Sequence, residues 1–238
     1  MLKMITFLVP TYNEKENIYL FINTIKKLNL DYKYNILFVD DNSVDGTKNK
    51  LLSAKEEFDN INYIIRFKKK RDLTQSLVLG IDLIKDKYTI ILDCDLQHEV
   101  IKINELVETI IKEKFDVVIG SRFIKNFQNI KMSNKRILES RIAIMICYLL
   151  GIKKIKDPLS GFFIIETKLL KNVKKKINTR GFKILFTILF LYKNKISTKE
   201  IPIKFDRRIY GKTKLNFRVK LLFLEQILKL LIKKLLFN

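Results

Sequence analysis

Short apolar runs rich in β-branched residues alternate with segments whose apolar residues recur at helical spacing. Five such runs lie in the first half of the chain, at Met4–Val9, Asn35–Val39, Tyr63–Ile65, Tyr88–Leu92 and Asp116–Ile119. Strand-length runs separated by amphipathic helices are typical of βαβ units on a parallel sheet. The pattern therefore predicts an α/β fold with a mostly parallel sheet flanked by helices.

The first predicted helix follows the first of these runs. Its apolar residues share one helical face, at Ile18, Ile22, Ile25 and Leu28. Asn13, with Glu16 three residues later, is a candidate N-cap with its capping partner, so the helix is expected to begin near Glu14.

Beyond Gly120 the alternation weakens. The pattern there predicts a basic loop, a helix, a glycine-containing turn and a second helix, at Ile124–Arg136, Ser140–Leu150, Asp157–Gly161 and Phe182–Tyr192. The last segment, Phe217–Phe237, mixes leucines with charged residues as an interfacial helix does, although its periodicity equally suits a helix packed on the domain. The sequence contains no internal repeat and no low-complexity linker, so one continuous globular unit is expected.

Charge divides the chain into two unlike halves. The 238 residues carry a formal net charge of +22, from 47 Lys and Arg against 25 Asp and Glu. Residues 1–120 hold 18 basic and 19 acidic residues, which leaves 29 and 6 for residues 121–238, so the halves carry −1 and +23. Such a potential favours a polyanionic partner: a nucleic acid, an anionic membrane surface or a phosphorylated substrate.

Cysteine content and hydropathy indicate a cytoplasmic protein. Cys94 and Cys147 provide neither a disulfide framework nor a metal-ligand spacing, and the apolar run Met4–Val9 leads into a polar turn rather than a signal-peptide cleavage site. The longest uncharged apolar run of the second half, Ile142–Ile152, is far shorter than the roughly 20 residues that a membrane-spanning helix needs. We therefore expect no membrane span.

Two aspartates at the end of a strand-like run are the strongest candidates for chemistry. Asp93 and Asp95 follow the run Tyr88–Leu92, and their two-residue spacing predicts both carboxylates on one side of the strand. Like charges so close together require a cation, and oxygen ligands without a histidine or cysteine cluster favour Mg²⁺ or Mn²⁺ completed by substrate phosphates. The carboxyl ends of strands are also where open α/β sheets bind ligands.

Other polar residues allow more than one interpretation. Asp40 and Asp41 close the second run and either accept hydrogen bonds from a nucleobase or belong to ordinary turn chemistry. Basic residues beside turn glycines, such as Arg122, are candidates for phosphate binding, because a guanidinium binds phosphate in a bidentate manner. Gly211-Lys-Thr213 lacks the glycine that a P-loop requires at position 206, and the one histidine, His98, excludes a histidine-based zinc site.

Seven motifs follow one another in order along nearly the whole chain. They are Val9-Pro-Thr-Tyr-Asn-Glu14, Val39-Asp-Asp-Asn-Ser43 with Asp45-Gly-Thr47, Asp93-Cys-Asp-Leu-Gln-His98, Gly120-Ser-Arg122, Asp157-Pro-Leu-Ser-Gly161, Gly181-Phe-Lys183, and Glu200-Ile-Pro-Ile203 with Phe205-x-x-Arg208-x-x-Gly211-x-Thr-Lys-Leu215. In these motifs the chain resembles the dolichol-phosphate (polyprenyl-phosphate) mannosyltransferases. That family has a GT-A type, Rossmann-like nucleotide-binding fold, and it moves mannose with inversion from GDP-mannose to a polyprenyl phosphate at the membrane surface.

The resemblance implies a role for particular residues. Asp93, Asp95 and Gln97 would hold the divalent metal, Mg²⁺ or Mn²⁺, and Asp93, Asp95 and Arg122 would be the catalytic groups. Nucleotide-sugar binding would fall to Pro10, Tyr12, Glu14, Val39, Asp41, Cys94, Lys183 and Arg208, and acceptor-phosphate binding to Arg122, Arg136 and Lys214. The catalytic domain would cover residues 1–215, with a nucleotide and metal half to 120 and an acceptor half from 121, followed by an amphipathic helix over 216–238.

The chain departs from the family at three places. Glu99-Val100 replaces prolines that relatives commonly carry, and Asp72 stands where many have a Gly-Leu pair, so both loops are expected to differ in shape. Some relatives continue into transmembrane helices, whereas this chain stops at Asn238, which implies a peripheral enzyme or a membrane-anchored partner subunit. Ile142–Leu150 and Phe217–Phe237 are the candidate helices for lying on an anionic membrane surface.

Three alternatives stay open. The same fold could use UDP-glucose or a UDP-aminosugar with undecaprenyl phosphate or a polysaccharide hydroxyl, although a hydroxyl needs a general base and an ionised lipid phosphate does not. A nucleic-acid-binding protein would exploit the basic half, but no aromatic residues are interleaved with the basic ones in a binding motif, and we expect no nucleic-acid partner. A catalytically silent subunit is disfavoured by the intact pair of Asp93 and Asp95.

Overall fold

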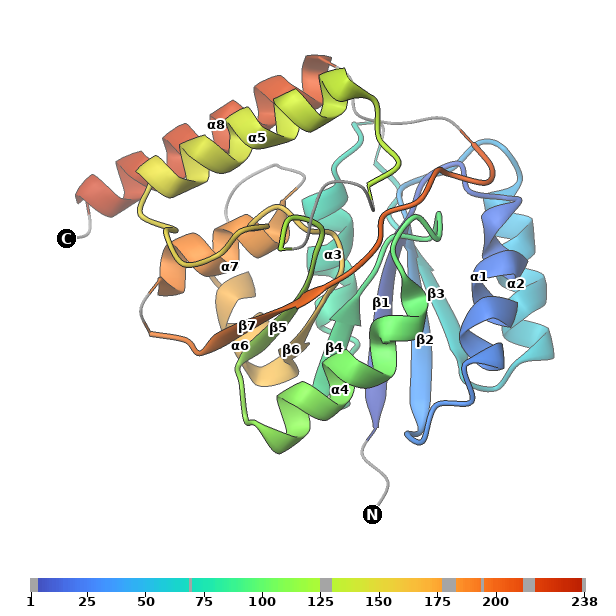
Figure 1. Cartoon of the computed structure of the whole chain (residues 1–238). Helices are drawn as coiled ribbons and strands as arrows, with labels where there is room; N and C mark the ends of the chain where they lie inside the picture. The colour runs from blue at the N-terminus through green and yellow to red at the C-terminus, as the bar shows by residue number, and fades with distance from the viewer. Residues whose placement is uncertain are drawn as a thin grey trace.

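One mixed sheet forms the centre of the molecule, and helices cover both of its faces (Figure 1). The structure, a computed structural model, describes residues 4–68, 70–124, 130–176, 183–193, 195–211 and 217–236. Its strands are β1 (Ile5–Thr11), β2 (Tyr34–Asp40), β3 (Ile61–Ile65), β4 (Tyr88–Ile91), β5 (Val117–Ser121), β6 (Phe163–Glu166) and β7 (Thr198–Pro202). The order across the sheet is β3-β2-β1-β4-β6-β5-β7, and the pairs are parallel except those of β6 with β4 and β5. The predicted α/β fold with a mostly parallel sheet is confirmed.

Strand alternation divides the core into two layers. The helices are α1 (Asn17–Lys27), α2 (Thr47–Glu57), α3 (Leu73–Ile81), the 3-10 helix η1 (Val100–Lys102), α4 (Ile103–Lys112), α5 (Asn134–Leu149), α6 (Thr167–Lys174), α7 (Ile184–Tyr192) and α8 (Phe217–Leu236). Phe7 and Val9 pack with residues of α1, α2 and α4, whereas Leu8 between them packs with residues of α3, α6 and α7. Strands covered on both faces need apolar side chains at every position, which explains their continuous apolar runs.

The five predicted strands are present as β1 to β5, with ends shifted by at most two residues. Two further strands, β6 and β7, and the helix α6 were missed. The antiparallel β6 lies between β4 and β5, and β7 pairs with β5 at the edge of the sheet. The second half of the chain therefore extends the same sheet that the first half begins.

The predicted start of the first helix is wrong. α1 begins at Asn17 rather than near Glu14, and Asn13 does not cap it. Asn13 has a left-handed backbone conformation, with φ of 52°, which asparagine tolerates better than most residues. Its N–H donates to Ser43 Oγ (2.8 Å), and its Oδ1 accepts from the backbone N–H of Val44 (3.1 Å). Asn13 thus joins the loop after β1 to the loop after β2.

The helix predicted at Ser140–Leu150 begins six residues earlier, at Asn134. Ser133 caps it, because its Oγ accepts from the backbone N–H of Arg136 (3.4 Å) and supplies one of the partners that a helix start lacks. The helix predicted at Phe182–Tyr192 is present as α7, and Phe182 lies outside the described residues.

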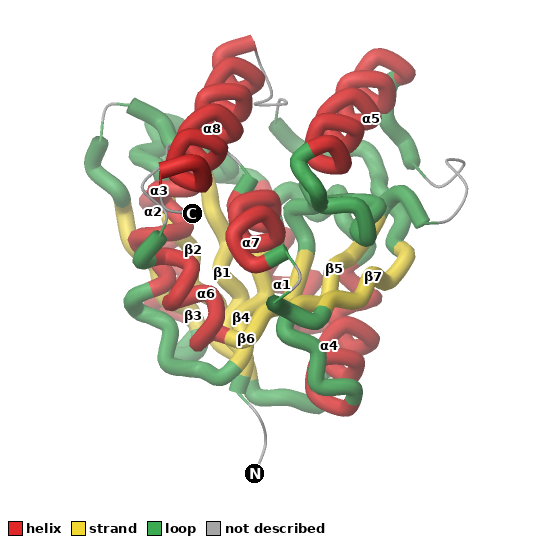
Figure 2. Tube along the Cα trace, turned by 90° about the vertical axis from the view of Figure 1, so that its left-hand side faces the viewer, coloured by secondary structure: helices red, strands yellow, loops and turns green. Residues whose placement is uncertain are grey.

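The helices α5 and α8 lie across the end of the molecule where the parallel strands finish (Figures 1 and 2). The buried Gln226 fixes α8 on α7, because its Nε2 donates to Thr187 Oγ1 (2.7 Å) and to the carbonyl of Lys183 (3.2 Å). An ion pair of Lys220 with Glu139 (2.6 Å) links α8 to α5. Within the described part of the chain, each helix is too short or too polar to cross a membrane.

Candidate active site

A cleft of about 190 Å³ opens where β1 and β4 end and where segment 205–208 crosses them. Most of the predicted site residues line it: Pro10, Tyr12, Glu14, Asp93, Cys94, Asp95, Gln97, Arg122, Arg136, Lys183 and Arg208. Sequence positions up to 209 residues apart, Pro10 and Val219, therefore meet in one cavity. Lys214 lies outside the described residues.

Val39 and Asp41 are not among the lining residues. The side chain of Val39 is fully buried in the core between the sheet and α3. Asp41, only 4% exposed, accepts hydrogen bonds from Arg66 Nε (2.6 Å) and from the backbone N–H of Asp72 (2.7 Å). In this structure Asp41 therefore holds the loop after β3 in place.

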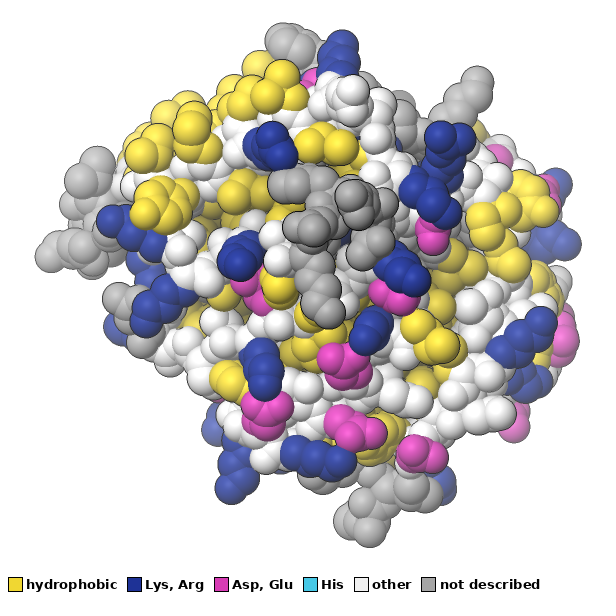
Figure 3. All heavy atoms as spheres, in the orientation of Figure 1, with side chains coloured by type: hydrophobic (Ala, Val, Ile, Leu, Met, Phe, Trp, Pro, Cys, Tyr) yellow, Lys and Arg dark blue, Asp and Glu magenta, His cyan; other side chains and the backbone are white. Residues whose placement is uncertain are grey.

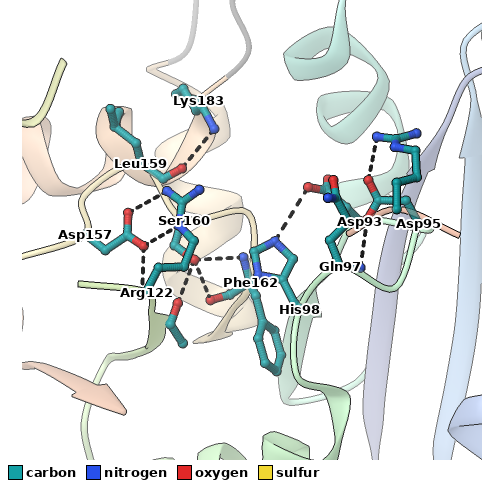
Figure 4. Close-up of polar contacts among 12 residues, drawn as sticks. Asp93, Asp95, Gln97, His98, Arg122, Asp157, Leu159, Ser160, Phe162 and Lys183 are labelled. Carbon is teal, nitrogen blue, oxygen red and sulfur yellow. Dashed lines mark hydrogen bonds and ion pairs between the residues drawn. The ribbon is translucent and has the colours of Figure 1, made fainter. Parts of the chain in front are cut away.

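The acidic pair lies in the loop after β4, not on the strand. The strand ends at Ile91, and both Asp93 and Asp95 face the cleft from the turn that follows (Figure 4). Asp93 Oδ2 is 3.8 Å from His98 Nε2, and Asp95 Oδ2 is 2.5 Å from Arg208 Nη2. Both carboxylates line one cavity, as predicted. They reach it from the loop after β4, so the two-residue period of a strand is not the reason.

Arg208 connects the acidic pair to the loop after β1. Its Nη2 pairs with Asp95, and its Nη1 lies 3.0 Å from Glu14 Oε1. Both carboxylates have side chains that are only 7% exposed, so the guanidinium compensates charges that water reaches poorly.

The two aspartates respond differently to their surroundings. Burial, and next the charge of Asp93, raise the pKa of the Asp95 carboxyl despite Arg208. Desolvation also opposes ionisation of Asp93, but the hydrogen bond and charge of His98, followed by Lys183 and Arg208, lower the pKa of this carboxyl. Two carboxylates with divergent pKa values in one cleft are typical of a functional site.

Close packing holds Asp93 and His98 in place. A Cβ atom at Gly161 would lie 2.7 Å from Asp93 Oδ2, so any side chain at the end of the Asp157–Gly161 turn would displace this carboxylate. The ring of His98, 3% exposed, packs edge-on against Phe205, with 5.0 Å between ring centroids.

Segment 205–206 pairs with the loop that carries the acidic residues. The backbone N–H of Asp206 donates to the carbonyl of Gln97 (2.8 Å), and Gln97 Nε2 donates to the carbonyl of Asp206 (2.9 Å). The side chain of Glu99 accepts from the backbone N–H of Lys204 (2.8 Å). The loop thus takes its shape from the segment that also carries Arg208.

A second, positively charged group lies across His98 from the acidic pair (Figure 4). Arg122 makes a bidentate pair with Asp157, through Nε to Oδ2 (2.7 Å) and Nη2 to Oδ1 (2.8 Å), and Asp157 is fully buried. Burial alone would raise the pKa of Asp157, but the charge and hydrogen bonds of Arg122 lower it. The fork that we predicted for phosphate is therefore occupied by a carboxylate.

Lys183 and Arg136 complete this group. Burial, and next the charge of Arg122, lower the pKa of both side chains. Lys183 Nζ donates to the carbonyl of Leu159 (2.9 Å). Among the described residues, Arg136 Nε is buried without a hydrogen-bond partner. Cations that repel one another beside an unsatisfied donor form a site that suits an anion.

The residues of the acidic side fit a divalent metal in their chemistry. They offer the carboxylate oxygens of Asp93 and Asp95, and the amide oxygen of Gln97 is the end of that side chain that can act as a ligand, since its nitrogen is bonded. The guanidinium on Asp95 marks a position that attracts positive charge. Within the described residues, no group of three or more His, Cys, Asp and Glu side chains is arranged to hold a metal ion.

Asp157 is the main residue that sequence reasoning did not assign. It belongs to one of the seven motifs, but its role depends on Arg122, 35 positions earlier. Glu200 from β7 fixes the backbone around it, because Oε1 accepts from the N–H of Asp157 (2.9 Å) and Oε2 from that of Lys156 (2.9 Å). The motif itself was the available signal, since a buried aspartate requires a partner.

The fold agrees with the comparisons to known proteins. The chain belongs to glycosyl transferase family 2, whose model matches residues 6–174. A dolichol-phosphate mannosyltransferase of Pyrococcus furiosus is 33% identical over 95% of this chain and 63% of its own length. The dolichol-phosphate mannosyltransferase of Saccharomyces cerevisiae is 29% identical over 95% of this chain and 86% of its own length. The chain thus spans less than two thirds of the archaeal relative.

Solved structures share the fold. Glucosyl-3-phosphoglycerate synthase from Mycobacterium tuberculosis, in complex with phosphoglyceric acid, superposes with a TM-score of 0.69 over 97% of this chain and 79% of that one, at 14% identity. The same enzyme with Mn²⁺, uridine diphosphate and glucosyl-3-phosphoglycerate gives a TM-score of 0.69 at 13% identity. At this identity the likeness establishes the architecture alone.

The pair of Arg122 and Asp157 yields a stability prediction. We expect Asp157→Asn to lower the free energy of unfolding at pH 7 by about 3 kcal/mol, because it leaves a buried guanidinium without its counter-charge. The folded-state pKa of Asp157 is lowered, so its contribution is complete above the ordinary carboxyl value of about 4 and is lost as the pH falls through the folded value. The difference between wild type and variant in the free energy of unfolding, measured with urea, should therefore become smaller as the pH falls into the acid range.

Glu113→Gln serves as the control. It removes an ion pair with Lys199 whose side chains are 46% and 43% exposed, and it should change stability by less than about 1 kcal/mol. An Asp157→Asn variant as stable as wild type at pH 7 would show that the buried pair contributes nothing.

Proposed function

We propose that the chain transfers mannose from GDP-mannose to a polyprenyl phosphate, with inversion and with a divalent metal, at the cytoplasmic surface of a membrane. The relatives that carry the name dolichol-phosphate mannosyltransferase support this reaction, because their similarity extends over 95% of the chain. The observation that carries the proposal is a second cavity joined to the cleft.

An apolar groove of about 370 Å³ runs between α5 and α8. Most of its lining is hydrocarbon, from Ile142, Ala143, Ile144, Ile146, Leu159, Phe223 and Leu224. It shares with the cleft the residues Arg122, Arg136, Lys183 and Val219. An acidic centre, a cationic group and an apolar groove therefore follow one another, and this order matches a phosphate that carries a hydrocarbon chain.

The positive group would position the acceptor. An ionised lipid phosphate needs no general base, so its oxygen can attack the anomeric carbon while the bond from that carbon to the diphosphate breaks and its electron pair leaves with GDP. Lys183, Arg136 and the remaining donors of Arg122 would hold the phosphate oxygens in line with that bond, which gives inversion. Asp157 would act as a positioning residue, because it fixes the orientation of Arg122.

The acidic side would receive the donor. Asp93, Asp95 and Gln97 would hold a metal, which when bound neutralises charge on the departing diphosphate. Arg208 lies beside this pair, and its planar fork suits a diphosphate oxygen. The solved relative that contains Mn²⁺ with uridine diphosphate supports a metal-bound nucleotide on this fold.

The outer faces of α5 and α8 would rest on the membrane. Large apolar side chains between 47% and 75% exposed lie along both helices: Leu138, Ile142, Met145, Tyr148 and Leu149 on α5, and Leu221, Leu224, Leu228 and Ile232 on α8. Figure 3 displays apolar surface gathered at this end of the molecule. An exposed apolar face on the strongly basic half of the chain suits an anionic bilayer, and residues 216–238 would form an interface helix attached to a catalytic domain over 1–215.

The transfer reaction can be measured directly. With radiolabelled GDP-mannose, Mg²⁺ or Mn²⁺ and a polyprenyl phosphate, we expect label in the organic phase, and we expect chelation of the metal to abolish it. Asp95→Asn should reduce the rate by at least about a hundredfold, because it removes a ligand charge at the diphosphate. Asp82→Asn, which removes a 62% exposed carboxylate on the surface, is the control and should leave the rate unchanged. Transfer from UDP-sugars but not from GDP-mannose would overturn the donor assignment.

The groove makes a prediction about acceptor length. Ala143→Trp should fill the groove and raise the KM for a long-chain polyprenyl phosphate by about tenfold, while a short prenyl phosphate that ends inside the cleft is affected much less. Met145→Trp places the same ring on the outer face of α5, away from the groove lining, and is the matched control. Equal effects of Ala143→Trp on both acceptors would show that the hydrocarbon tail of the acceptor does not lie in this groove.

Membrane binding can be tested by sedimentation with anionic vesicles at low salt. We expect the wild type to co-sediment, and we expect the double variant Met145→Glu and Leu228→Glu to remain largely in the supernatant, because it puts charge into the apolar face. Leu52→Glu changes another exposed leucine, 46% exposed on α2, and should not alter binding. Failure of the wild type to bind such vesicles would contradict the membrane assignment.

A further inference from the structure

One end of the cleft carries an arginine that the reaction described above does not use. The guanidinium carbon of Arg71 lies 4.2 Å from the centroid of the Tyr12 ring, and both side chains line the cleft. Tyr12 belongs to the loop after β1, and Arg71 to the segment that leads into α3. A guanidinium at this distance over an aromatic ring is held by cation–π attraction and by stacking.

This end of the cleft lies on the other side of the acidic pair from the cationic group. The acceptor side is the one that Arg122 and Lys183 share with the apolar groove. In the sheet, β4, which leads to Asp93 and Asp95, stands between β1, which leads to Tyr12, and β5, which leads to Arg122. A nucleotide whose diphosphate sits at the aspartates, with its sugar towards the acceptor, extends its base towards Tyr12 and Arg71. The position of Arg71 therefore corresponds to the base rather than to the phosphates.

The loop around Arg71 is fixed on both sides of it. Arg66 Nη2 donates to the carbonyl of Lys70 (2.6 Å), and the backbone N–H of Asp72 donates to Asp41 Oδ2 (2.7 Å). Arg66 and Asp41 form an ion pair whose side chains are 13% and 4% exposed.

The other end of this loop is secured by α3. Asp72 caps the helix, because its Oδ1 accepts from the backbone N–H of Gln75 (3.1 Å). A loop anchored immediately before and after one residue presents that residue's side chain from a preorganised backbone, which reduces the entropy lost on binding.

We infer that Arg71 is a specificity-determining residue that recognises the nucleobase of the donor, through two parallel hydrogen bonds to a purine edge with adjacent carbonyl and ring-nitrogen acceptors. Guanine presents these acceptors at O6 and N7, and an arginine fork matches them in a bidentate manner. Adenine replaces the carbonyl with an amino donor, and uracil has no such edge. The inference rests on the proposed use of a guanine nucleotide and names the residue that selects it.

The test is calorimetric titration of wild type and variants with GDP, IDP, ADP and UDP at fixed Mg²⁺. Arg71→Ala should weaken GDP and IDP by about ten- to a hundredfold, since a bidentate pair discriminates bases by about 1–3 kcal/mol, and should change ADP and UDP by less than about threefold. Arg71→Lys should behave like Arg71→Ala, because an ammonium keeps the charge but cannot form the fork. Lys70→Ala removes a neighbouring exposed charge from the same loop and should leave all four affinities unchanged.

The outcomes separate the inference from the function on which it rests. A wild type that binds UDP more tightly than GDP would defeat the proposed donor. A wild type that prefers GDP, together with an Arg71→Ala variant that keeps this preference, would overturn the inference alone. An equal loss for all four nucleotides would also overturn it, because Arg71 would then contact the ribose or the phosphates.

Discussion

The cleft depends on ion pairs that offset the like charges which the fold brings together. Asp93, Asp95 and Glu14 converge where the strands end, and the pairs of Arg208 with Asp95 and Glu14 offset part of that negative charge. On the other side, Asp157 pairs with Arg122. Burial, and next the charge of Arg122, lower the pKa of Arg136 and of Lys183. The acidic side is thus left with a net negative charge, and the other side with a net positive charge. Under the proposed function, the negative side would receive the metal with its diphosphate and the positive side would receive the acceptor phosphate.

The sheet lets the two sides share one cavity. β1 and β4 deliver the acidic side, and β5, which ends at Ser121, delivers Arg122 from the same edge. The antiparallel β6 fills the space between β4 and β5, and its entry loop carries Gly161 against Asp93. The sheet therefore sets the distance between the acidic loop and Arg122, while α5 adds Arg136 to the cationic group and builds the apolar groove with α8.

Local patterns were sufficient for the first half of the fold and for the acidic pair. Strands β1, β2, β4 and β5 are largely buried, and each of them, like the less buried edge strand β3, appears in the sequence as a run of apolar residues. β7 was missed because it is an edge strand with one buried residue, Ile201, in a largely polar segment. The start of α1 was wrong because Asn13 uses its side chain between two loops, which is a tertiary contact that a capping pattern does not reveal.

In the site, too, the sequence predicted what depends on neighbouring positions and missed what depends on distant ones. Asp93 and Asp95 were found from neighbours in sequence, whereas the partners of Arg122 and Asp41 lie 35 and 25 or more positions away. Motifs identified these residues as important without indicating that each is bonded to another part of the chain. Sequence therefore predicted which residues line the cleft better than it predicted what each one contacts.

Segment 205–208 has a consequence for the order in which the enzyme is made. It shapes the loop at Gln97 and brings Arg208 to Asp95 and Glu14, which precede it by 113 and 194 positions. A ribosome exposes the amino-terminal strands first, and they can pair before segment 205–208 has been made. Until residue 208 emerges, the nascent chain holds an acidic cluster without its counter-ion. Completion of the cleft thus waits for the synthesis of segment 205–208, and a shorter nascent chain lacks the guanidinium that pairs with Asp95 and Glu14.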